Sequence, residues 1–251
     1  MATELLVVQH VEREGPDRIA AWATQRDVPV RLIRPGQGET LPDPLTHGPA
    51  VAVLLGGPMG VNERQQPELH WLEQELAWLK RWLAQGRPTL GICLGAQLLC
   101  VASGGRVEPL RHGSAGHPLR EVGFGAISWK ASDRELPWLK HIPRHQLVLH
   151  WHGDRCLLPP QAQLLASTLL CQEQAFQIGS AAVGLQFHVE ASPASVERWI
   201  REDQEFIQAA GSSAEQIRSD QLLYSDELEQ QARALLHPLL DSLLIKAEQQ
   251  R

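Results

Sequence analysis

Cysteine is scarce in this chain, and its spacing excludes two kinds of site. Only four cysteines occur among 251 residues. No two of them have the Cys-x-x-Cys spacing that marks a zinc site or a redox pair. Thiols this far apart fit a reducing compartment, in which each one stays free. The sequence therefore predicts no disulfide and no metal site.

Long apolar runs and blocks of positive charge are also missing. No apolar stretch approaches the roughly 18 residues that a membrane span needs, and no run of five or more Lys or Arg residues occurs. With 29 acidic against 23 basic residues, the formal net charge of −6 disfavours nucleic acid and anionic membranes as partners. Residues 1–4 lack the basic start of a secretory signal. We therefore expect a soluble, cytoplasmic protein.

Internal repeats and the nucleotide-binding motif G-x-x-x-x-G-K-[ST] are absent as well, so no cofactor is expected. The 43% apolar content of 251 residues is enough for one main domain with a sizeable core. We expect this domain to span residues 1–210. Residues 211–251 carry a helical stripe interrupted at Pro238. They are expected to form a C-terminal helical extension packed on the same domain, with docking on another subunit as the alternative.

The order of the predicted elements indicates an α/β protein. In the first hundred residues, strand-length apolar runs at 5–10, 28–33, 50–55 and 89–92 alternate with helical spacing at 15–26, 67–84 and 96–102. This alternation is typical of a parallel sheet covered by helices. Short strands are then predicted at 106–110, 121–129, 147–151, 164–168, 175–178 and 182–187, followed by a helix over 193–209.

The stretch Gly91-Ile92-Cys93-Leu94-Gly95-Ala96-Gln97 places a cysteine where a strand turns sharply into a helix. Glycines at i−2 and i+2 allow a tight turn while the thiol projects above the sheet edge. The helix that follows supplies free N–H groups and partial positive charge, which favour the thiolate. A reactive Cys93 is therefore favoured over a buried small hydrophobe.

Two further patterns remain ambiguous by themselves. The loop Gly56-Gly57-Pro58-Met59-Gly60 could cradle an anion or oxyanion, although alone it is more often an ordinary turn. A base and an orienting carboxylate for the thiol are offered by three His-x-acid triplets: His10-Val11-Glu12, His152-Gly153-Asp154 and His188-Val189-Glu190. About one such triplet is expected by chance. All three could lie at a sheet edge, and the residues alone do not rank them.

Taken together, Gly56-Gly57-Pro58, the Cys93 stretch and Gln186-Phe187-His188-Val189-Glu190 resemble the class I (triad) glutamine amidotransferases. The similarity is greatest to free-standing proteins like the amidotransferase domain of GMP synthase, and it covers about residues 5–209. It implies a flavodoxin-like three-layer α/β/α sandwich with a mostly parallel central sheet. It also implies that Cys93 is the nucleophile, His188 the base and acid, and Glu190 the residue that orients His188.

The resemblance also implies substrate contacts from Gln97 and from the loop Trp151-His152-Gly153-Asp154, chiefly through Trp151, Gly153 and Asp154. An oxyanion hole is expected from the N–H groups of Gly57 and Leu94. His10 and Glu12 are left with a structural role. Two departures stand out: Val189 replaces a proline that is common in the family, and the segment 109–118 has no counterpart and could reshape the site entrance.

Three functions are consistent with these features. The first is hydrolysis of a γ-glutamyl amide through a cysteine thioester, with ammonia passing to a separate synthetase, because residues 211–251 are too few for an ATP-dependent domain. The second is a free-standing γ-glutamyl peptidase that acts on glutathione-like compounds. The third is a non-catalytic binding or regulatory subunit, against which the intact Cys93, His188 and Glu190 argue.

Overall fold

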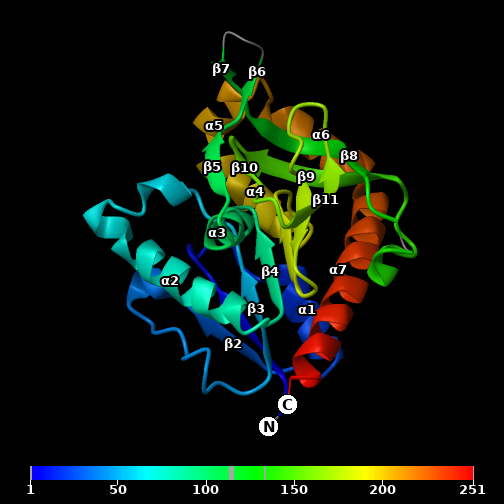
Figure 1. Ribbon diagram of the computed structural model, residues 1–251. Helices are drawn as coiled ribbons and strands as arrows, with labels where there is room; N and C mark the ends of the chain where they lie inside the picture. The colour runs from blue at the N-terminus through cyan, green and yellow to red at the C-terminus, as the bar shows by residue number, and fades with distance from the viewer. Residues whose placement is uncertain (1, 113–115, 133, 251) are drawn as a thin grey trace.

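The computed structural model describes residues 2–112, 116–132 and 134–250, and its centre is a nine-stranded sheet (Figure 1). The strand order is β2-β1-β3-β4-β13-β12-β11-β8-β9. The strands are β1 (Glu4–Val8), β2 (Val30–Ile33), β3 (Ala50–Leu54), β4 (Thr89–Ile92), β8 (Glu121–Trp129), β9 (His145–His152), β11 (Ala162–Ser167), β12 (Ala175–Ile178) and β13 (Ala182–Leu185). All strands except β8 and β12 run in one direction.

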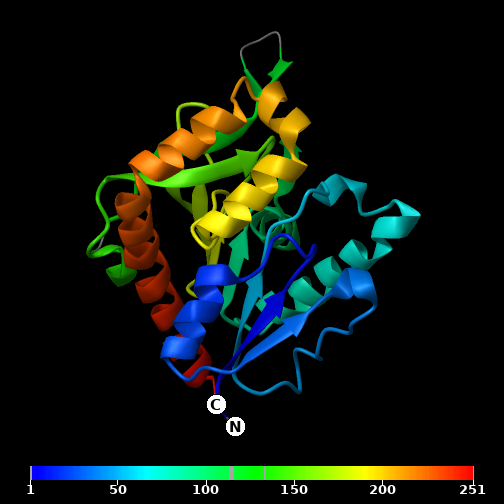
Figure 2. The same cartoon turned by 180° about the vertical axis from the view of Figure 1, so that it is seen from behind.

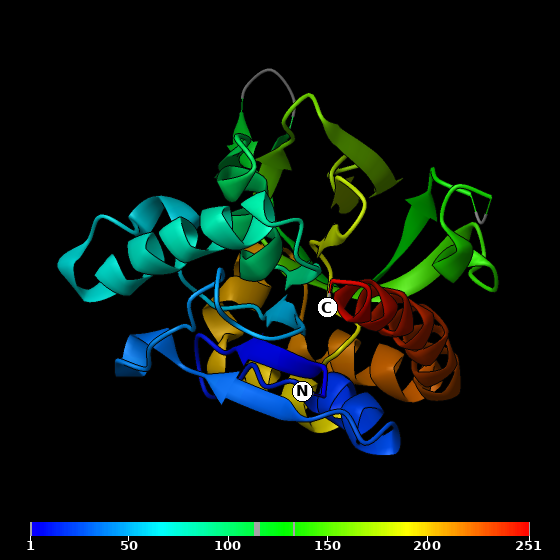
Figure 3. The ribbon, with the colours of Figure 1, turned by 60° about the horizontal axis from the view of Figure 1, so that its bottom comes forward.

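Helices cover both faces of the sheet. They are α1 (Asp17–Gln25), α2 (His70–Ala84), α3 (Leu94–Ala102), α4 (Pro193–Glu202), α5 (Gln204–Ala209), α6 (Ala214–Leu223) and α7 (Ser225–Glu248). Side chains alternate along β1, so Leu5 and Val7 pack with α1 and α7, whereas Leu6 and Val8 pack with α2 and α3. Figures 2 and 3 show these helices on opposite sides of the strands. The predicted three-layer α/β/α fold with a mostly parallel central sheet is confirmed.

The antiparallel half of the sheet returns to the end of β13. β8 and β9 form a long pair, and Leu149 of β9 makes an isolated antiparallel bridge to His188, three residues beyond β13. The His188 N–H donates to the Leu149 carbonyl at 2.8 Å. This contact brings the end of β9 beside the carboxyl ends of the parallel strands, which is where α/β proteins place their sites.

Smaller elements complete the fold. β5 (Arg106–Pro109) pairs with β10 (Asp154–Leu157), and β6 (Arg111–His112) pairs with β7 (His117–Pro118). Short 3-10 turns occupy Pro35–Gln37, Val61–Glu63, Pro67–Leu69 and Pro137–Leu139. β10 was not predicted, because it has only four residues and is separated from β9 by a single residue. No helix in the described part of the chain combines the length and the apolarity needed to cross a membrane.

Two helical predictions were wrong. α7 is not interrupted at Pro238 but continues through it. A proline inside a helix costs about 3 kcal/mol, whereas Leu235, Leu236, Leu239 and Leu240 on this helix are fully buried, each stabilising the fold by about 1.5 to 3 kcal/mol. The expected helix 193–209 is instead two helices separated at Asp203, whose carboxylate binds side chains from two other segments.

Candidate active site

Cys93 occupies a strained turn between β4 and α3. Its backbone has φ 51° and ψ −107°, outside the regions that residues with a side chain favour. The two flanking glycines are needed for close approach: a Cβ on Gly91 would lie 2.5 Å from the Gly95 carbonyl oxygen, and one on Gly95 would lie 2.1 Å from the Leu54 oxygen. The turn therefore depends on both glycines, and it holds the Cys93 side chain at the start of α3.

His188 and Glu190 form a buried pair behind the thiol. His188 Nδ1 lies 2.7 Å from Glu190 Oε1, and the Val189 N–H donates to Glu190 Oε2 at 3.0 Å. Burial alone would lower the pKa of His188, but the Glu190 carboxylate and the Cys93 thiol raise it well above its ordinary value. Because proline has no N–H to donate, Val189 gives Glu190 a contact that proline at this position would not.

Other polar groups surround the sulfur. Cys93 Sγ donates to the Trp151 carbonyl at 3.8 Å, and Gln186 Nε2 donates to Sγ at 3.6 Å. Gln97 Nε2 in turn donates to Gln186 Oε1 at 3.4 Å. The Trp199 ring packs edge-on against His188 with the centroids 4.8 Å apart. These contacts fix the positions of the thiol and the imidazole.

A cavity of about 320 Å³ opens above Cys93. Of the residues predicted to act at the site, its lining contains Gly57, Cys93, Leu94, Gln97, Trp151, Gly153, Asp154 and His188. Glu190 is absent from that lining and lies behind His188. A Cβ on Gly57 would lie 2.9 Å from a Leu94 methyl carbon, so the two residues expected to form the oxyanion hole are neighbours. The structure thus gathers residues from four distant segments around one space.

The other two histidine triplets do not hold together. His10 Nε2 contacts Glu75 at 3.1 Å, and Nδ1 donates to the Gly56 carbonyl at 3.0 Å, while Glu12 is exposed. Burial lowers the pKa of His10, but the Glu75 carboxylate outweighs it, so this pKa is raised. His10 therefore supports the loop that carries Gly57.

His152 likewise pairs outside its own triplet. Its Nε2 lies 3.1 Å from Glu121 Oε2, and its Nδ1 donates to the Asp154 carbonyl at 3.0 Å. Burial raises the pKa of the Asp154 carboxyl, which lines the cavity. Of the three triplets, only His188-Val189-Glu190 forms a pair between its own histidine and acid.

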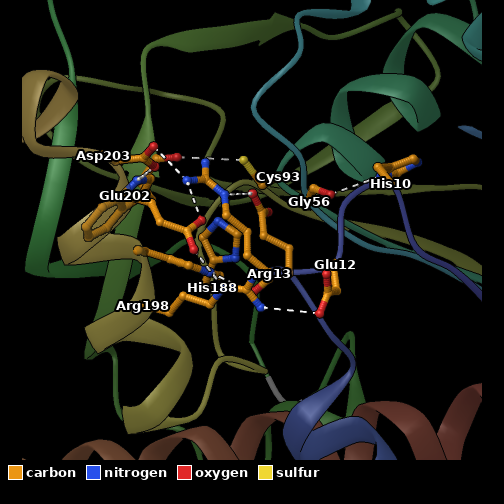
Figure 4. Close-up of polar contacts among 12 residues, drawn as sticks. His10, Glu12, Arg13, Gly56, Cys93, His188, Arg198, Glu202 and Asp203 are labelled. Atoms are coloured by element: carbon orange, nitrogen blue, oxygen red, sulfur yellow. Dashed lines mark hydrogen bonds and ion pairs between the residues drawn. The ribbon is translucent and has the colours of Figure 1, made fainter.

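Four charged residues of the cavity lining, Arg13, Glu14, Arg120 and Asp203, were missed by the sequence reasoning. Arg13 and Asp203 are labelled in Figure 4. Arg13 Nη1 lies 2.7 Å from Asp203 Oδ1, and the other oxygen of Asp203 accepts from Trp151 Nε1 at 2.9 Å. Glu14 presses against Gly56, where a Cβ would lie 2.2 Å from its Oε2 and 3.1 Å from His188 Cε1. Burial raises the pKa of Glu14, against the attraction of His188 and Arg13. The one sequence signal for Arg13 and Glu14 is that they follow the first parallel strand, whose carboxyl end faces the site.

The segment 109–118 borders the cavity. Pro109 and Pro118, at its two ends, are among the lining residues, and β6 and β7 pair between them. Residues 113–115 of this segment lie outside the described residues. The described ends are therefore close enough to limit the entrance to the site.

Comparison with known proteins places these features in a family. The family model for class I glutamine amidotransferases matches residues 19–204. A protein named as glutamine amidotransferase-like, YfeJ of Salmonella typhimurium, is 29% identical over 201 residues, which are 79% of this chain and 80% of that protein. The glutamine-hydrolysing GMP synthase of Phocaeicola vulgatus is 40% identical over 105 residues, 41% of this chain but only 19% of that enzyme.

A solved structure agrees over nearly the full length. The crystal structure of a glutamine amidotransferase from Thermotoga maritima superposes with a TM-score of 0.82 at 27% identity, covering 97% of this chain and 99% of that one. The family model, which matches 186 of 251 residues, and this likeness lead to the same conclusion. The chain belongs to the class I glutamine amidotransferases.

Proposed function

We propose that this protein hydrolyses the γ-amide of glutamine through a thioester on Cys93. The observation that carries the proposal is the shared cavity, in which a strained cysteine at a helix start lies beside a histidine held by Glu190 at 2.7 Å. A thiol needs a proton acceptor and an orienting carboxylate behind it for acyl transfer. Cys93, His188 and Glu190 provide these three groups.

The first half-reaction forms the thioester. The thiol proton of Cys93 moves to His188 Nε2, because Nδ1 is engaged by Glu190. The sulfur attacks the γ-carbonyl carbon, and the resulting oxyanion accepts hydrogen bonds from the N–H groups of Gly57 and Leu94. His188 then gives its proton to the amide nitrogen, the C–N bond breaks and ammonia leaves.

The second half-reaction releases glutamate. Water, which enters where ammonia has left, gives a proton to His188 Nε2 and attacks the thioester carbon. The C–S bond breaks and His188 returns the proton to the sulfur. The Glu190 carboxylate stabilises the positive charge that forms on the His188 imidazole in both steps. This role agrees with the raised pKa of His188.

We assign substrate recognition to other residues that line the cavity. Gln97, Trp151, Gly153 and Asp154 line the cavity, and we infer that the Asp154 carboxylate binds the α-ammonium group of the γ-glutamyl substrate. Arg120 lies over the Phe206 ring at 5.1 Å and lines the same cavity, so its guanidinium is a partner for the α-carboxylate. A cavity of 320 Å³ is at the small end of ligand sites, which suits an amino acid.

Two candidate functions are compatible with this site. The matched GMP synthases are named as glutamine-hydrolysing, and the match covers 19% of the first of them. By analogy with these proteins, we propose that a separate synthetase accepts the ammonia. The second candidate is a γ-glutamyl peptidase. Phe206 and the end prolines of the 109–118 segment line the cavity without a role in the glutamine scheme, and they would contact a larger leaving group.

Turnover of a panel of γ-glutamyl compounds tests the proposal. Glutamine, glutathione and other γ-glutamyl peptides are each incubated with the full chain, and glutamate and the released amine are measured. We expect kcat/KM to be greatest for glutamine and the Cys93→Ala protein to be inactive. Cys171→Ala is the matched control because this buried thiol lies outside the cavity. Native turnover by Cys93→Ala would refute the thioester, and a preference for peptides would favour the peptidase.

A further inference from the structure

Three side chains that could bind a metal ion lie on β8 and β9. Figure 1 shows these two strands side by side. Glu121, His150 and His152 each offer one ligand atom, and these atoms lie within 4.8 Å of one another. His150 and His152 are two apart on one strand and so share a face, and Glu121 is the cross-strand neighbour of His152. All three side chains are buried.

His150 has no partner of its own in this cluster. It is 4% exposed, and although the Gly125 backbone approaches its ring, neither ring nitrogen makes a hydrogen bond of normal geometry within the described residues. Its ring fills space left by glycine, because a Cβ on Gly125 would lie 3.1 Å from His150 Cδ2. A buried imidazole without a partner costs free energy, so its position calls for a bound group that accepts its lone pair.

The side chains around His150 direct several atoms with lone pairs toward one another, with no positively charged group between them in the described residues. His152 Nδ1 donates to the Asp154 carbonyl, so in the neutral ring Nε2 carries a lone pair, and it faces Glu121 Oε2 at 3.1 Å. Gln174 Nε2 lies 2.5 Å from the same carboxylate oxygen, and Gln174 Oε1 has no hydrogen-bond partner within the described residues. A cation between these lone pairs would bind one ring nitrogen of His150 together with the His152 and Glu121 atoms that face each other.

We propose that Glu121, His150 and His152 bind one Zn²⁺ ion, with Gln174 Oε1 as a fourth ligand once its amide rotates. Two histidines and a carboxylate are a common zinc ligand set. Ligand atoms about 2.1 Å from a tetrahedral ion lie about 3.4 Å apart, close to the 3.1 Å between His152 Nε2 and Glu121 Oε2. The cysteine spacing on which the expectation of no metal rested does not bear on this site, whose ligands come from two strands.

The site would brace the catalytic thiol. Trp151 lies between the two histidine ligands on β9, and its carbonyl accepts from Cys93 Sγ at 3.8 Å. The hydrogen bond from His152 Nδ1 to the Asp154 carbonyl also orients this proposed ligand, as a backbone acceptor does at many zinc sites. The ion is thus a structural element of the loop that lines the substrate cavity, and it has no place in the hydrolytic steps.

Zinc content of the full-length protein tests the site. The chelator-treated protein is dialysed against ZnCl₂, and bound zinc per chain is measured by elemental mass spectrometry, with a melting scan in parallel. We expect one tightly bound ion and a raised melting temperature in the wild type. His150→Leu should bind zinc at least 100-fold more weakly, because even an indirect partner of a ligand contributes 10-fold to 100-fold. His141→Gln, a change at an exposed histidine, should bind as the wild type does.

Two further measurements separate this site from the thiol centre and guard against misfolding. Cys93→Ser must keep the ion, since zinc lost with that thiol would place it at Cys93 and His188. Co²⁺ in the wild-type protein should give ligand-field bands without a thiolate charge-transfer band, because the ligands are nitrogen and oxygen. Wild-type protein that takes up no stoichiometric zinc, equal uptake by His150→Leu, or a thiolate band would each overturn the proposal.

Discussion

Two buried histidine–glutamate pairs, His188–Glu190 and His152–Glu121, differ in what the second ring nitrogen meets. His188 is held by Glu190 at 2.7 Å and has the Cys93 thiol beside it. His152 contacts Glu121 at 3.1 Å, but its other nitrogen donates to a backbone carbonyl. Because Nδ1 of His152 is bonded to a carbonyl and Nε2 faces Glu121, neither nitrogen of this ring is free to relay a proton to substrate. The carboxylate alone therefore does not mark a catalytic histidine.

The His10–Glu75 pair also shows that a carboxylate partner does not by itself mark a catalytic histidine. Nδ1 of His10 donates to the carbonyl of Gly56, next to the expected oxyanion donor Gly57. The three histidines that are equivalent as sequence triplets thus have three different surroundings: a thiol for His188, the side chains of Glu121 and His150 for His152, and a loop carbonyl for His10. Substitution of one carboxylate at a time tests whether these surroundings determine the role of each histidine.

The largest difference is expected between Glu190→Gln and Glu121→Gln. Loss of the Glu190 charge lets burial lower the pKa of His188 and removes the group that holds Nδ1–H, so kcat/KM for glutamine should fall about 10³-fold to 10⁴-fold. Glu121→Gln touches no group in the proposed proton path, and kcat/KM should fall by less than about tenfold. Steady-state assays of both proteins decide this, and equal losses would remove the distinction between the pairs.

Glu75→Gln should lower stability rather than turnover. Removing one partner of a buried pair costs about 3 to 5 kcal/mol. Because the folded-state pKa of His10 is raised above 6.5, the pair stabilises the fold fully below pH 6.5, and this contribution fades as the pH rises through the raised pKa. Urea unfolding at pH 6 and pH 9 should show the greater loss at pH 6. Glu73→Gln, on the exposed side of α2, is the control, and a loss that grows with pH would contradict the assignment.

Glu14→Gln should stabilise the protein modestly. Burial raises the pKa of this carboxyl in the folded state, so its contribution is favourable below the unfolded pKa and is lost as the pH rises through the folded value. At pH 7 the neutral amide should therefore raise the free energy of unfolding by about 1 kcal/mol, with no gain near pH 4. Unfolding curves at the two pH values test the sign, and a destabilised variant at pH 7 would show that Arg13 and His188 outweigh burial.

The smallest effect is expected for Val189→Pro. This change restores the residue common in the family but removes the N–H that donates to Glu190 Oε2 at 3.0 Å. A lost hydrogen bond to a charged group is worth about 1.5 to 3 kcal/mol, and less where the second oxygen keeps its partner, so kcat/KM should fall by no more than about tenfold. A loss as large as that of Glu190→Gln would mean that the N–H, and not the charge, holds the pair.

Local chemistry made part of this architecture predictable. The glycine-flanked Cys93 and the apolar runs of β1, β3 and β4 depend on residues close in sequence, so the turn and the parallel half of the sheet were placed to within a few residues. The resemblance then selected His188 among three equal triplets.

Long-range contacts account for what was missed. Glu75 lies 65 residues from His10, and no spacing rule connects them. Asp203 ends a helix because its carboxylate binds Arg13, which is 190 residues away. Pro238 stays inside α7 because its leucine neighbours are buried against the sheet. In each case a tertiary contact outweighs the local preference.

Labelling by a glutamine analogue that carries a diazoketone in place of the amide tests the thioester most directly. Such an electrophile needs a nucleophile at the γ-carbonyl position, so we expect one adduct per chain, on Cys93, with turnover lost in proportion. Cys171, whose pKa burial raises to about 12, should stay unmodified, and Cys93→Ser should not react. Peptide mapping that finds the adduct on another residue, or complete labelling of Cys93 with glutamine turnover intact, would contradict the account.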